Sequence, residues 1–273
     1  MKRNAFTLLE LLIVIAIIAL LITIVSPCLR RARASASDSI CKRNLSDLAA
    51  AWLAHSQLNE QNLCGGSTYR SPYLGSYGGG VWDWVVMFDD PGTWKKPSDD
   101  PAAIGALYPY INNSEVYRCP SHVFPAYPVS YSMPGTLNGQ QVNVFGEAGI
   151  WYPYRRRAQI RNPSETVAFL EEFDPRGYNC GSFVLESHET WSDYLAGNHD
   201  KGDNFAFTDG HVEYWKYQND KTLQLLVDFS SEHGYHGDTK LNAPGSVDLD
   251  RLWNAYVDYN ISLPVIGGLG PWP

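Results

Sequence analysis

The sequence lacks a surplus of positive charge. Its formal net charge is −8 at pH 7, and charged residues make up only 18% of it. The first 60 residues carry a net +3, so residues 61–273 carry −11. A nucleic-acid-binding module needs a basic face that neutralises phosphates. The charge distribution therefore argues against nucleic acid as a partner of the larger part of the chain.

Short motifs of common enzyme chemistry are also absent. The sequence contains no Gly-x-Ser-x-Gly elbow, no His-Glu-x-x-His pair, no phosphate-binding loop and no paired Cys-x-x-Cys knuckles. It contains no internal repeat or low-complexity segment either. We therefore predict no catalytic residues and a protein that is not an enzyme. An anchored enzyme of an unrecognised type is the alternative.

One long apolar run is present near the N-terminus. Residues 6–25 form a stretch of twenty, which is long enough to cross a bilayer, yet Glu10 lies inside it. An acid in a membrane span costs a few kcal/mol. A signal peptide cut near residues 34–36 and a lipoprotein anchor at Cys28 are alternatives. Arg30, Arg31 and Arg33 lie between the apolar run and the signal-peptide site, which is unusual for a signal peptide. Pro27 stands directly before Cys28, where a lipoprotein usually has a small residue.

The stretch Ala5-Phe6-Thr7-Leu8-Leu9-Glu10 resembles the class III leader junction of type IV pilins and type II secretion pseudopilins. That resemblance implies that a prepilin peptidase removes residues 1–5 and methylates the new amine of Phe6. The family usually has Gly where this chain has Ala5. Glu10 becomes the fifth mature residue and an assembly residue, whose carboxylate meets the amine of a neighbouring subunit in a low-dielectric setting. A snorkelling or protonated acid in an ordinary anchor is the alternative.

Helical patterning continues beyond the apolar run. Apolar residues recur there at three- and four-residue spacing, which predicts an amphipathic face: Leu45, Leu48, Ala49, Trp52 and Leu53. We expect a helix over residues 6–60 whose first half spans the membrane and whose second half packs on a globular domain. Pro27 is expected to kink or locally unwind this helix. A proline at this offset is also similar to the pilin pattern, and a simple helix end is the alternative.

Residues 61–273 have the glycine and proline content of a loop-rich domain. Short apolar or aromatic segments between the turns predict strands at 81–88, 142–145, 166–169 and 181–185, and residues 222–233 predict a surface helix. The predicted fold class is α+β. It is pilin-like, with a long N-terminal helix packed on an exported domain that contains an antiparallel β-sheet.

Asp209-Gly210 lies between two alternating runs and predicts a two-residue β-hairpin over residues 204–215, with positive φ at both turn residues. Placing Thr208 opposite His211 assigns four residues to one face, which should be buried: Phe205, Phe207, Val212 and Tyr214. Trp215 falls on the other face in this register.

His199 is followed by nine residues and then Asp209-Gly210. Together with the leader, this His-x9-Asp-Gly pattern resembles a large bacterial class of prepilin-type proteins named for it. Residues 106–111, 116–121 and 130–133 are also similar to that class. The resemblance implies a pilin-like ladle shape and says little about activity.

A metal site is one interpretation of this region, with His199, Asp203 and Asp209 as tentative ligands and Asp200 or His211 as further donors. Calcium prefers oxygen ligands, and pseudopilins related to the major secretion subunit often hold a structural calcium in this part of the fold. In the alternative, Asp209 only forms the turn and His199 hydrogen-bonds nearby backbone.

The chain has five cysteines, and Cys28 lies at the membrane boundary. In an exported chain some of the other four are expected to form disulfides, and four cysteines allow three connectivities that the sequence does not separate: Cys41, Cys64, Cys119 and Cys180.

The predicted function is that of a filament subunit, either of a type IV pilus or of a type II secretion pseudopilus. Its partners are then a prepilin peptidase, other pilin or pseudopilin subunits and an inner-membrane assembly platform. The chain would cross the inner membrane once, with its larger domain in the periplasm or outside the cell. Aromatic residues make up 13% of the sequence, so an anchored glycan- or substrate-binding protein that does not polymerise is the alternative.

Overall fold

The structure is a computed structural model. It describes residues 8–66, 83–85, 102–103, 105–122, 129–138, 142–144, 149–151, 154–173, 181–185, 189–223 and 241–256. Ala5, Phe6 and Cys180 lie outside the described residues, as do most of the strand expected at 81–88 and most of the helix expected at 222–233.

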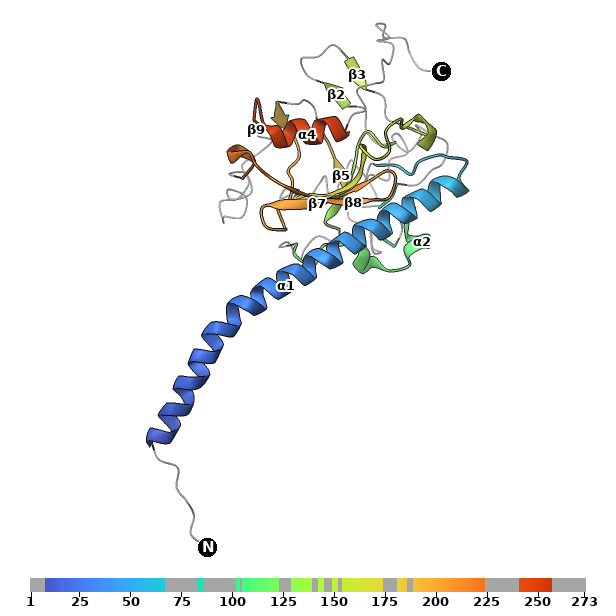
Figure 1. Ribbon diagram of the computed structural model, residues 1–273. Helices are drawn as coiled ribbons and strands as arrows, with labels where there is room; N and C mark the ends of the chain where they lie inside the picture. Colours follow the sequence, from blue (N-terminus) through green and yellow to red (C-terminus); the bar gives the residue numbers. More distant parts are fainter. Residues whose placement is uncertain are drawn as a thin grey trace, which may run out of the picture.

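Helix α1 (Leu8–Leu58) has 51 residues and dominates the shape of the described chain. At 1.5 Å per residue it is about 76 Å long. The helix continues through Pro27, so the expected local unwinding and the alternative of a helix end are both wrong. Figure 1 shows α1 as an unbroken, gently curved helix.

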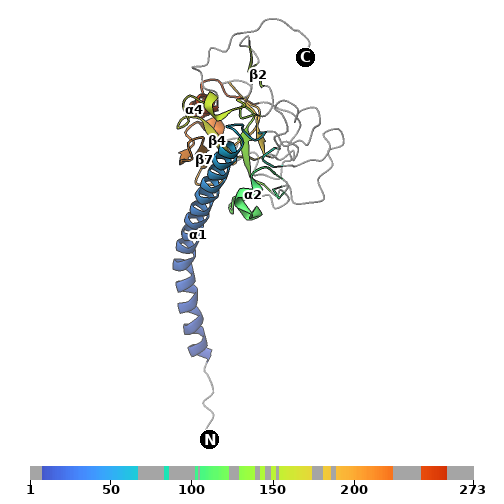
Figure 2. The ribbon, with the colours of Figure 1, turned by 90° about the vertical axis from the view of Figure 1, so that its right-hand side faces the viewer.

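The two halves of α1 have different surroundings. Every large aliphatic residue from Leu8 to Val25 is at least 44% exposed, and Figures 1 and 2 show this half projecting away from the rest of the fold. In the second half, Leu45, Leu48 and Trp52 are at most 1% exposed. The predicted amphipathic face is therefore confirmed, and only the second half of the helix is used to build the core.

The main sheet has five strands in the order β5-β1-β4-β7-β8. Its neighbours are antiparallel except β1 and β5, which are parallel. The strands are β1 (Tyr131–Pro134), β4 (Val167–Glu171), β5 (Ser182–Phe183), β7 (Gly202–Phe207) and β8 (Val212–Lys216). The strands predicted at 142–145, 166–169 and 181–185 are thus confirmed as β2, β4 and β5.

Two small sheets and several short helices complete the described elements. The small sheets pair β2 (Val142–Val144) with β3 (Gly149–Trp151) and β6 (Thr190–Trp191) with β9 (Leu241–Asn242). The helices are α2 (Tyr108–Ile111), η2 (Ser114–Tyr117), η3 (Arg157–Gln159) and α4 (Val247–Tyr256). Of the strand expected at 81–88, Asp83 makes an isolated bridge with Gly65. Residues 220–223 form a helical turn, and the rest of the helix expected at 222–233 lies outside the described residues.

The sheet is covered on both faces. Helix α1 packs against β4, β7 and β8 on one face, while α4 packs on the other, as Figure 1 shows. Ala206 of β7 belongs to the core on the α1 side, whereas Phe205 and Phe207 pack with Leu252 of α4. All six residues of β7 are buried for this reason. The predicted α+β fold, a long helix on an antiparallel-rich sheet, is confirmed.

A β-bulge in β4 changes which residues face α1. Val167 pairs with Phe207 and Phe169 with Ala206, so the register shifts at Ala168. Ala168 and Phe169 both join the α1-side core, whereas Val167 and Leu170 pack on the α4 side. Alternation resumes after the bulge, which turns Glu171 towards α1. Without the extra residue Glu171 would face the opposite side of the sheet.

The hairpin of β7 and β8 has a register different from the predicted one. Ala206 pairs with Val212 and Asp203 with Trp215, so Phe207 rather than Thr208 closes the loop with His211. Only Gly210 has a positive φ, of 101°. The loop therefore has three residues and ends in a glycine with left-handed backbone conformation, which is another common type of hairpin connection. The predicted two-residue turn is wrong.

The shift of one residue exchanges the faces of β8. Trp215 stacks on Phe205 with ring centroids 4.3 Å apart, on the α4 side. Val212 instead packs with the α1-side core. The expectation that Val212 and Tyr214 share a buried face with Phe205 and Phe207 is therefore wrong, because a one-residue slip reverses every side chain of a strand.

Candidate functional site

The two residues expected to act in assembly, Glu10 and Pro27, lie in the half of α1 that projects from the domain. Glu10 is in the first turn of the helix and is exposed. Pro27 lies within the helix, at the end of its apolar run. In the described part of the chain, α1 is the one helix long and apolar enough to cross a membrane. The structure therefore holds an apolar rod, with an acid near its end, clear of the domain.

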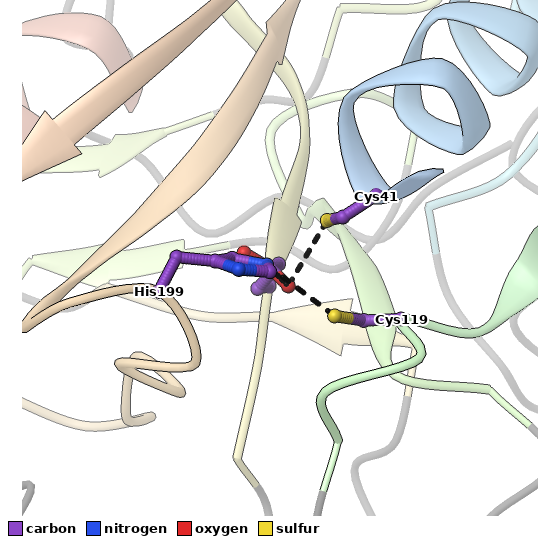
Figure 3. A group of neighbouring side chains, drawn as sticks. Cys41, Cys119 and His199 are labelled. Atoms are coloured by element: carbon purple, nitrogen blue, oxygen red, sulfur yellow. Dashed lines mark hydrogen bonds and ion pairs between the residues drawn. The ribbon is translucent and has the colours of Figure 1, made fainter. Parts of the chain in front are cut away.

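A second candidate site lies where α1 meets the sheet. Figure 3 shows the sulfurs of Cys41 and Cys119 and the imidazole of His199 pointing towards one another. Together with the carboxylate of Glu171 they form a group whose four ligand atoms all lie within 4.8 Å of one another. All four side chains are buried, and none is more than 6% exposed.

The closest contacts of this group form a chain. Cys41 Sγ lies 3.2 Å from Glu171 Oε1, which lies 3.1 Å from His199 Nε2. His199 Nε2 lies 3.4 Å from Cys119 Sγ. Two thiols, an imidazole and a carboxylate thus converge on one point in the interior. We call these residues, Cys41, Cys119, Glu171 and His199, the buried cluster.

Each member of the cluster comes from a different element. Cys41 lies on the buried stripe of α1, one turn before Leu45. Cys119 follows η2, and its backbone N–H donates to Ser130 Oγ at 2.6 Å. Glu171 ends β4 and faces α1 because of the bulge. His199 precedes β7, where its N–H donates to the carbonyl of Gly202 at 3.0 Å.

The cluster has its own shell of hydrogen-bond donors. The hydroxyl of Tyr131 donates to Cys41 Sγ at 3.3 Å, and the backbone N–H of Ser121 donates to Cys119 Sγ at 3.4 Å. The backbone N–H of Asn204 donates to Glu171 Oε2 at 3.0 Å. On the far side of the imidazole, His199 Nδ1 lies 3.7 Å from Asp38 Oδ1. Every sulfur and the carboxylate therefore accept a hydrogen bond from outside the cluster.

The contacts of the cluster shift its protonation equilibria. Burial disfavours a charged imidazole, but hydrogen bonds with Cys119 and Glu171 raise the pKa of His199 to about 10. Burial also opposes ionisation of Glu171, yet His199 holds the pKa of this carboxyl below its usual value. The hydrogen bond from Cys41 lowers the pKa of the Cys119 thiol, whereas burial raises that of Cys41. In this arrangement the charged imidazole and the carboxylate stabilise each other beside two sulfurs.

A thiol next to an imidazole is also the pairing of a nucleophilic cysteine. Such a cysteine needs a path by which a substrate reaches its sulfur. Cys119 is only 1% exposed, and α1 supplies Cys41 as part of the cover. The arrangement therefore favours a role within the fold over reaction with an external molecule.

The structure does not bring the tentative metal ligands His199, Asp203 and Asp209 together. Asp203 accepts hydrogen bonds from the backbone N–H of Gly197 at 2.7 Å and from the hydroxyl of Tyr217 at 2.6 Å. Asp209 forms the hairpin turn and accepts from the backbone N–H of its neighbour at position 211. His199 instead meets two sulfurs and Glu171, and sulfur is a poor donor to calcium.

Of the four cysteines predicted to form disulfides, the three that the structure describes have free thiols. Cys41, Cys64 and Cys119 are buried free thiols, and Cys28 is an exposed one. Cys41, Cys119 and Glu171 were not predicted from the sequence as partners of His199. Their separations along the chain match no short metal-binding spacing, so the only available signal was that Cys119 and His199 each lie in a segment similar to the His-x9-Asp-Gly class.

Residues 1–26 match the family model described as the prokaryotic N-terminal methylation motif. The N-terminal segment is therefore of the prepilin type, in agreement with the resemblance drawn from residues 5–10. The match does not extend to the His-x9-Asp-Gly pattern, which stays a prediction. No curated protein and no solved structure matches the chain.

Proposed function

We propose that this chain is a prepilin-type filament subunit. A prepilin peptidase would cut it between Ala5 and Phe6 and methylate Phe6, and the mature chain would join a type IV pilus or a type II secretion pseudopilus. One observation carries the proposal. The described residues of the segment that matches the methylation motif, 8–26, form the half of α1 that projects, apolar and uncovered, from the domain.

An apolar rod of this kind needs a cover. Soluble proteins rarely expose contiguous apolar patches larger than a few hundred Å², yet the aliphatic residues from Leu8 to Val25 are all exposed. The bilayer would cover them before assembly, since α1 is long and apolar enough to span it. Helices of neighbouring subunits would cover them in the filament.

Glu10 would align each incoming subunit. Cleavage before Phe6 creates a positive amine, and an adjacent subunit can present its Glu10 carboxylate to that amine. Opposite charges attract far more strongly in a low-dielectric setting than in water, and a lone buried charge is penalised. The pair therefore favours the staggered packing in which both charges are compensated.

The domain would lie outside the cytoplasm, and the span would cross the inner membrane once before an assembly platform takes up the subunit. Arg30, Arg31 and Arg33 follow the span, whereas Lys2 and Arg3 precede it. This distribution slightly opposes the positive-inside rule, so the proposed orientation rests on the prepilin-type leader.

The aromatic residues give the rival binding function little support in the described part of the chain. Trp52, Trp84, Trp191 and Trp253 are at most 2% exposed. Large aromatic side chains that fill a core are unavailable to stack on a sugar. A filament subunit is therefore the function that the described residues support best.

A charge-neutral substitution at Glu10 tests the proposal. Glu10→Gln keeps the size of the side chain and removes its charge, and Glu115→Gln makes the same change at an exposed position on the domain. We expect both variants to insert and to yield a methylated N-terminal Phe6 by mass spectrometry. Sheared filaments should contain the control and the unmodified chain but not Glu10→Gln. Equal assembly of all three would reject the filament proposal, and so would an intact Met1.

A further inference from the structure

The buried cluster has the donor set of a structural zinc site. Zinc in structural sites is almost always held by four ligands in a tetrahedron, at about 2.3 Å from sulfur and about 2.0–2.2 Å from nitrogen or oxygen. Those bond lengths give ligand–ligand edges of about 3.4–3.8 Å. The observed contacts of 3.1 and 3.2 Å are slightly shorter than these edges, and the contact of 3.4 Å lies at the short end of their range. A small outward movement of the four side chains would open a tetrahedral site.

We propose that Cys41, Cys119, Glu171 and His199 bind one Zn²⁺ ion that fastens the second half of α1 to the sheet. Each ligand comes from a separate segment: α1, the loop after η2, the end of β4 and the loop before β7. The site thus crosslinks parts of the chain that are far apart in sequence. Zinc binds sulfur as thiolate and imidazole as the neutral ring, so on binding any protons on these ligand atoms pass to solvent and four metal–ligand bonds form.

The outer hydrogen bonds suit thiolates and an oriented imidazole. The donors on the two sulfurs, Tyr131 and the N–H of Ser121, point a proton at atoms that carry negative charge when bound to zinc. Zinc-bound histidines usually present their second nitrogen to a carboxylate or carbonyl. Asp38 lies 3.7 Å from the second nitrogen of His199, so a small movement would complete this arrangement.

The same contacts distinguish zinc from two other occupants. Calcium and magnesium take oxygen ligands, and only Glu171 supplies one here. A disulfide between Cys41 and Cys119 would involve only the two sulfurs. It would not explain why His199 and Glu171 lie at the same point. Four donors that meet at one point are explained by a metal ion that prefers thiolate and imidazole.

The first experiment measures metal in the full-length chain. The protein is purified in detergent with a tag that lacks histidine, under reducing conditions and without chelator, and its zinc is measured by mass spectrometry. Protein stripped with a chelator is then titrated with ZnCl₂ and, separately, with CaCl₂. We expect one equivalent of zinc per chain, no measurable calcium binding, and a lower melting temperature after stripping that added zinc restores.

Substitutions of single ligands test whether zinc binds at the buried cluster. Cys119→Ser and His199→Gln should each lose zinc, whereas Cys64→Ser should keep it, because Cys64 is an equally buried free thiol outside the cluster. Cobalt absorption provides a second readout on the unmodified chain, since thiolate-bound tetrahedral Co²⁺ has an intense visible spectrum that zinc abolishes. This measurement serves even where a substituted chain fails to fold.

Three results would overturn the proposal. One is a chain that binds no zinc while its thiols react freely. Another is a Cys41–Cys119 disulfide found by peptide mapping of protein isolated from the cell envelope without reductant. The last is zinc retained in full by both Cys119→Ser and His199→Gln. None of these results bears on filament assembly, which the Glu10 experiment tests separately.

Discussion

Asp38 Oδ1 accepts a hydrogen bond from the side-chain amide of Asn204 at 2.9 Å, although 166 positions separate the two residues. This bond joins α1 to β7 beside the buried cluster. Asp38 also forms an ion pair with Lys42, at 2.7 Å, one turn further along the helix. Both contacts belong to the region where the second half of α1 docks on the sheet.

Replacing Asp38 by alanine should loosen this docking. Asn204 is fully buried, and a buried amide that loses a charged acceptor costs about 1–3 kcal/mol. We expect Asp38→Ala to lower the free energy of unfolding of the full-length chain by roughly that amount, measured by urea denaturation in detergent.

Asp47→Ala is the matched control for this change. Asp47 is also an α1 carboxylate paired with a cation four residues away, but its partner Arg43 has a side chain that is 76% exposed. Exposed pairs of this kind contribute about 0.3–0.5 kcal/mol. Equal losses in the two variants would show that the Asp38–Asn204 bond adds nothing beyond a surface ion pair.

Leu45 should be among the residues on which the helix–sheet core depends most. Its side chain is fully buried between α1 and the sheet. Leu45→Ala should cost about 2–5 kcal/mol, from lost burial and from the cavity left behind. Leu58→Ala is the control, because Leu58 lies at the end of the same helix and is 75% exposed. Urea unfolding curves that coincide for the two variants would contradict the packing described here.

Gly202 should tolerate no side chain. A Cβ at this position would overlap the carbonyl oxygen of Trp215 in the paired strand. The edge of β7 would have to move away from β8, so we expect Gly202→Ala to abolish cooperative thermal unfolding or to lower the melting temperature sharply. Circular dichroism during heating measures this.

Gly245 offers a contrast in which only backbone strain is at issue. Its φ is 71°, and an added Cβ would meet no atom within 4 Å. Gly245→Ala should therefore cost only about 1–2 kcal/mol, the usual penalty of an L-residue in the left-handed region. A larger loss for Gly245→Ala than for Gly202→Ala would refute the steric argument.

His55 should make stability depend on pH. Burial lowers the pKa of this side chain below its ordinary value of about 6.5. The folded chain therefore holds His55 neutral, whereas the unfolded chain binds a proton once the pH falls below about 6.5. Stability from this residue is complete above pH 6.5 and is lost as the pH decreases towards the folded pKa, by at most about 1.4 kcal/mol per unit.

The check compares urea unfolding of the unmodified chain and His55→Gln at pH 7.5 and pH 5.5. We expect the decrease in stability between the two conditions to be smaller in His55→Gln, because glutamine cannot take up the proton. Parallel decreases would assign the acid sensitivity to other groups.

Local signals in the sequence were sufficient for several elements. The leader stretch at residues 5–10 predicted a prepilin-type N-terminus, which the family match to residues 1–26 supports. Spacing of Leu45, Leu48 and Trp52 predicted the buried face of α1, because one helix face repeats every three or four residues. The apolar segment at 166–169 predicted β4 because a short apolar run between turn signals is typical of a buried strand.

Local sequence signals could not predict the register of the strands. Asp209-Gly210 is compatible with both a two-residue and a three-residue hairpin loop. The choice between them places Trp215 with Phe205 or away from it, and packing of both faces of β7 decides that choice. The bulge at Ala168, which turns Glu171 towards α1, depends equally on pairing with a distant strand.

By itself, the sequence determined the prepilin-type N-terminus, the apolar rod and the acid within it, since each is a property of neighbouring residues. Only the tertiary structure decided that His199 meets Cys41, Cys119 and Glu171 rather than Asp203 and Asp209. The physical reason is that four segments converge there through helix docking, a β-bulge and a loop. None of these is encoded by spacing along the chain.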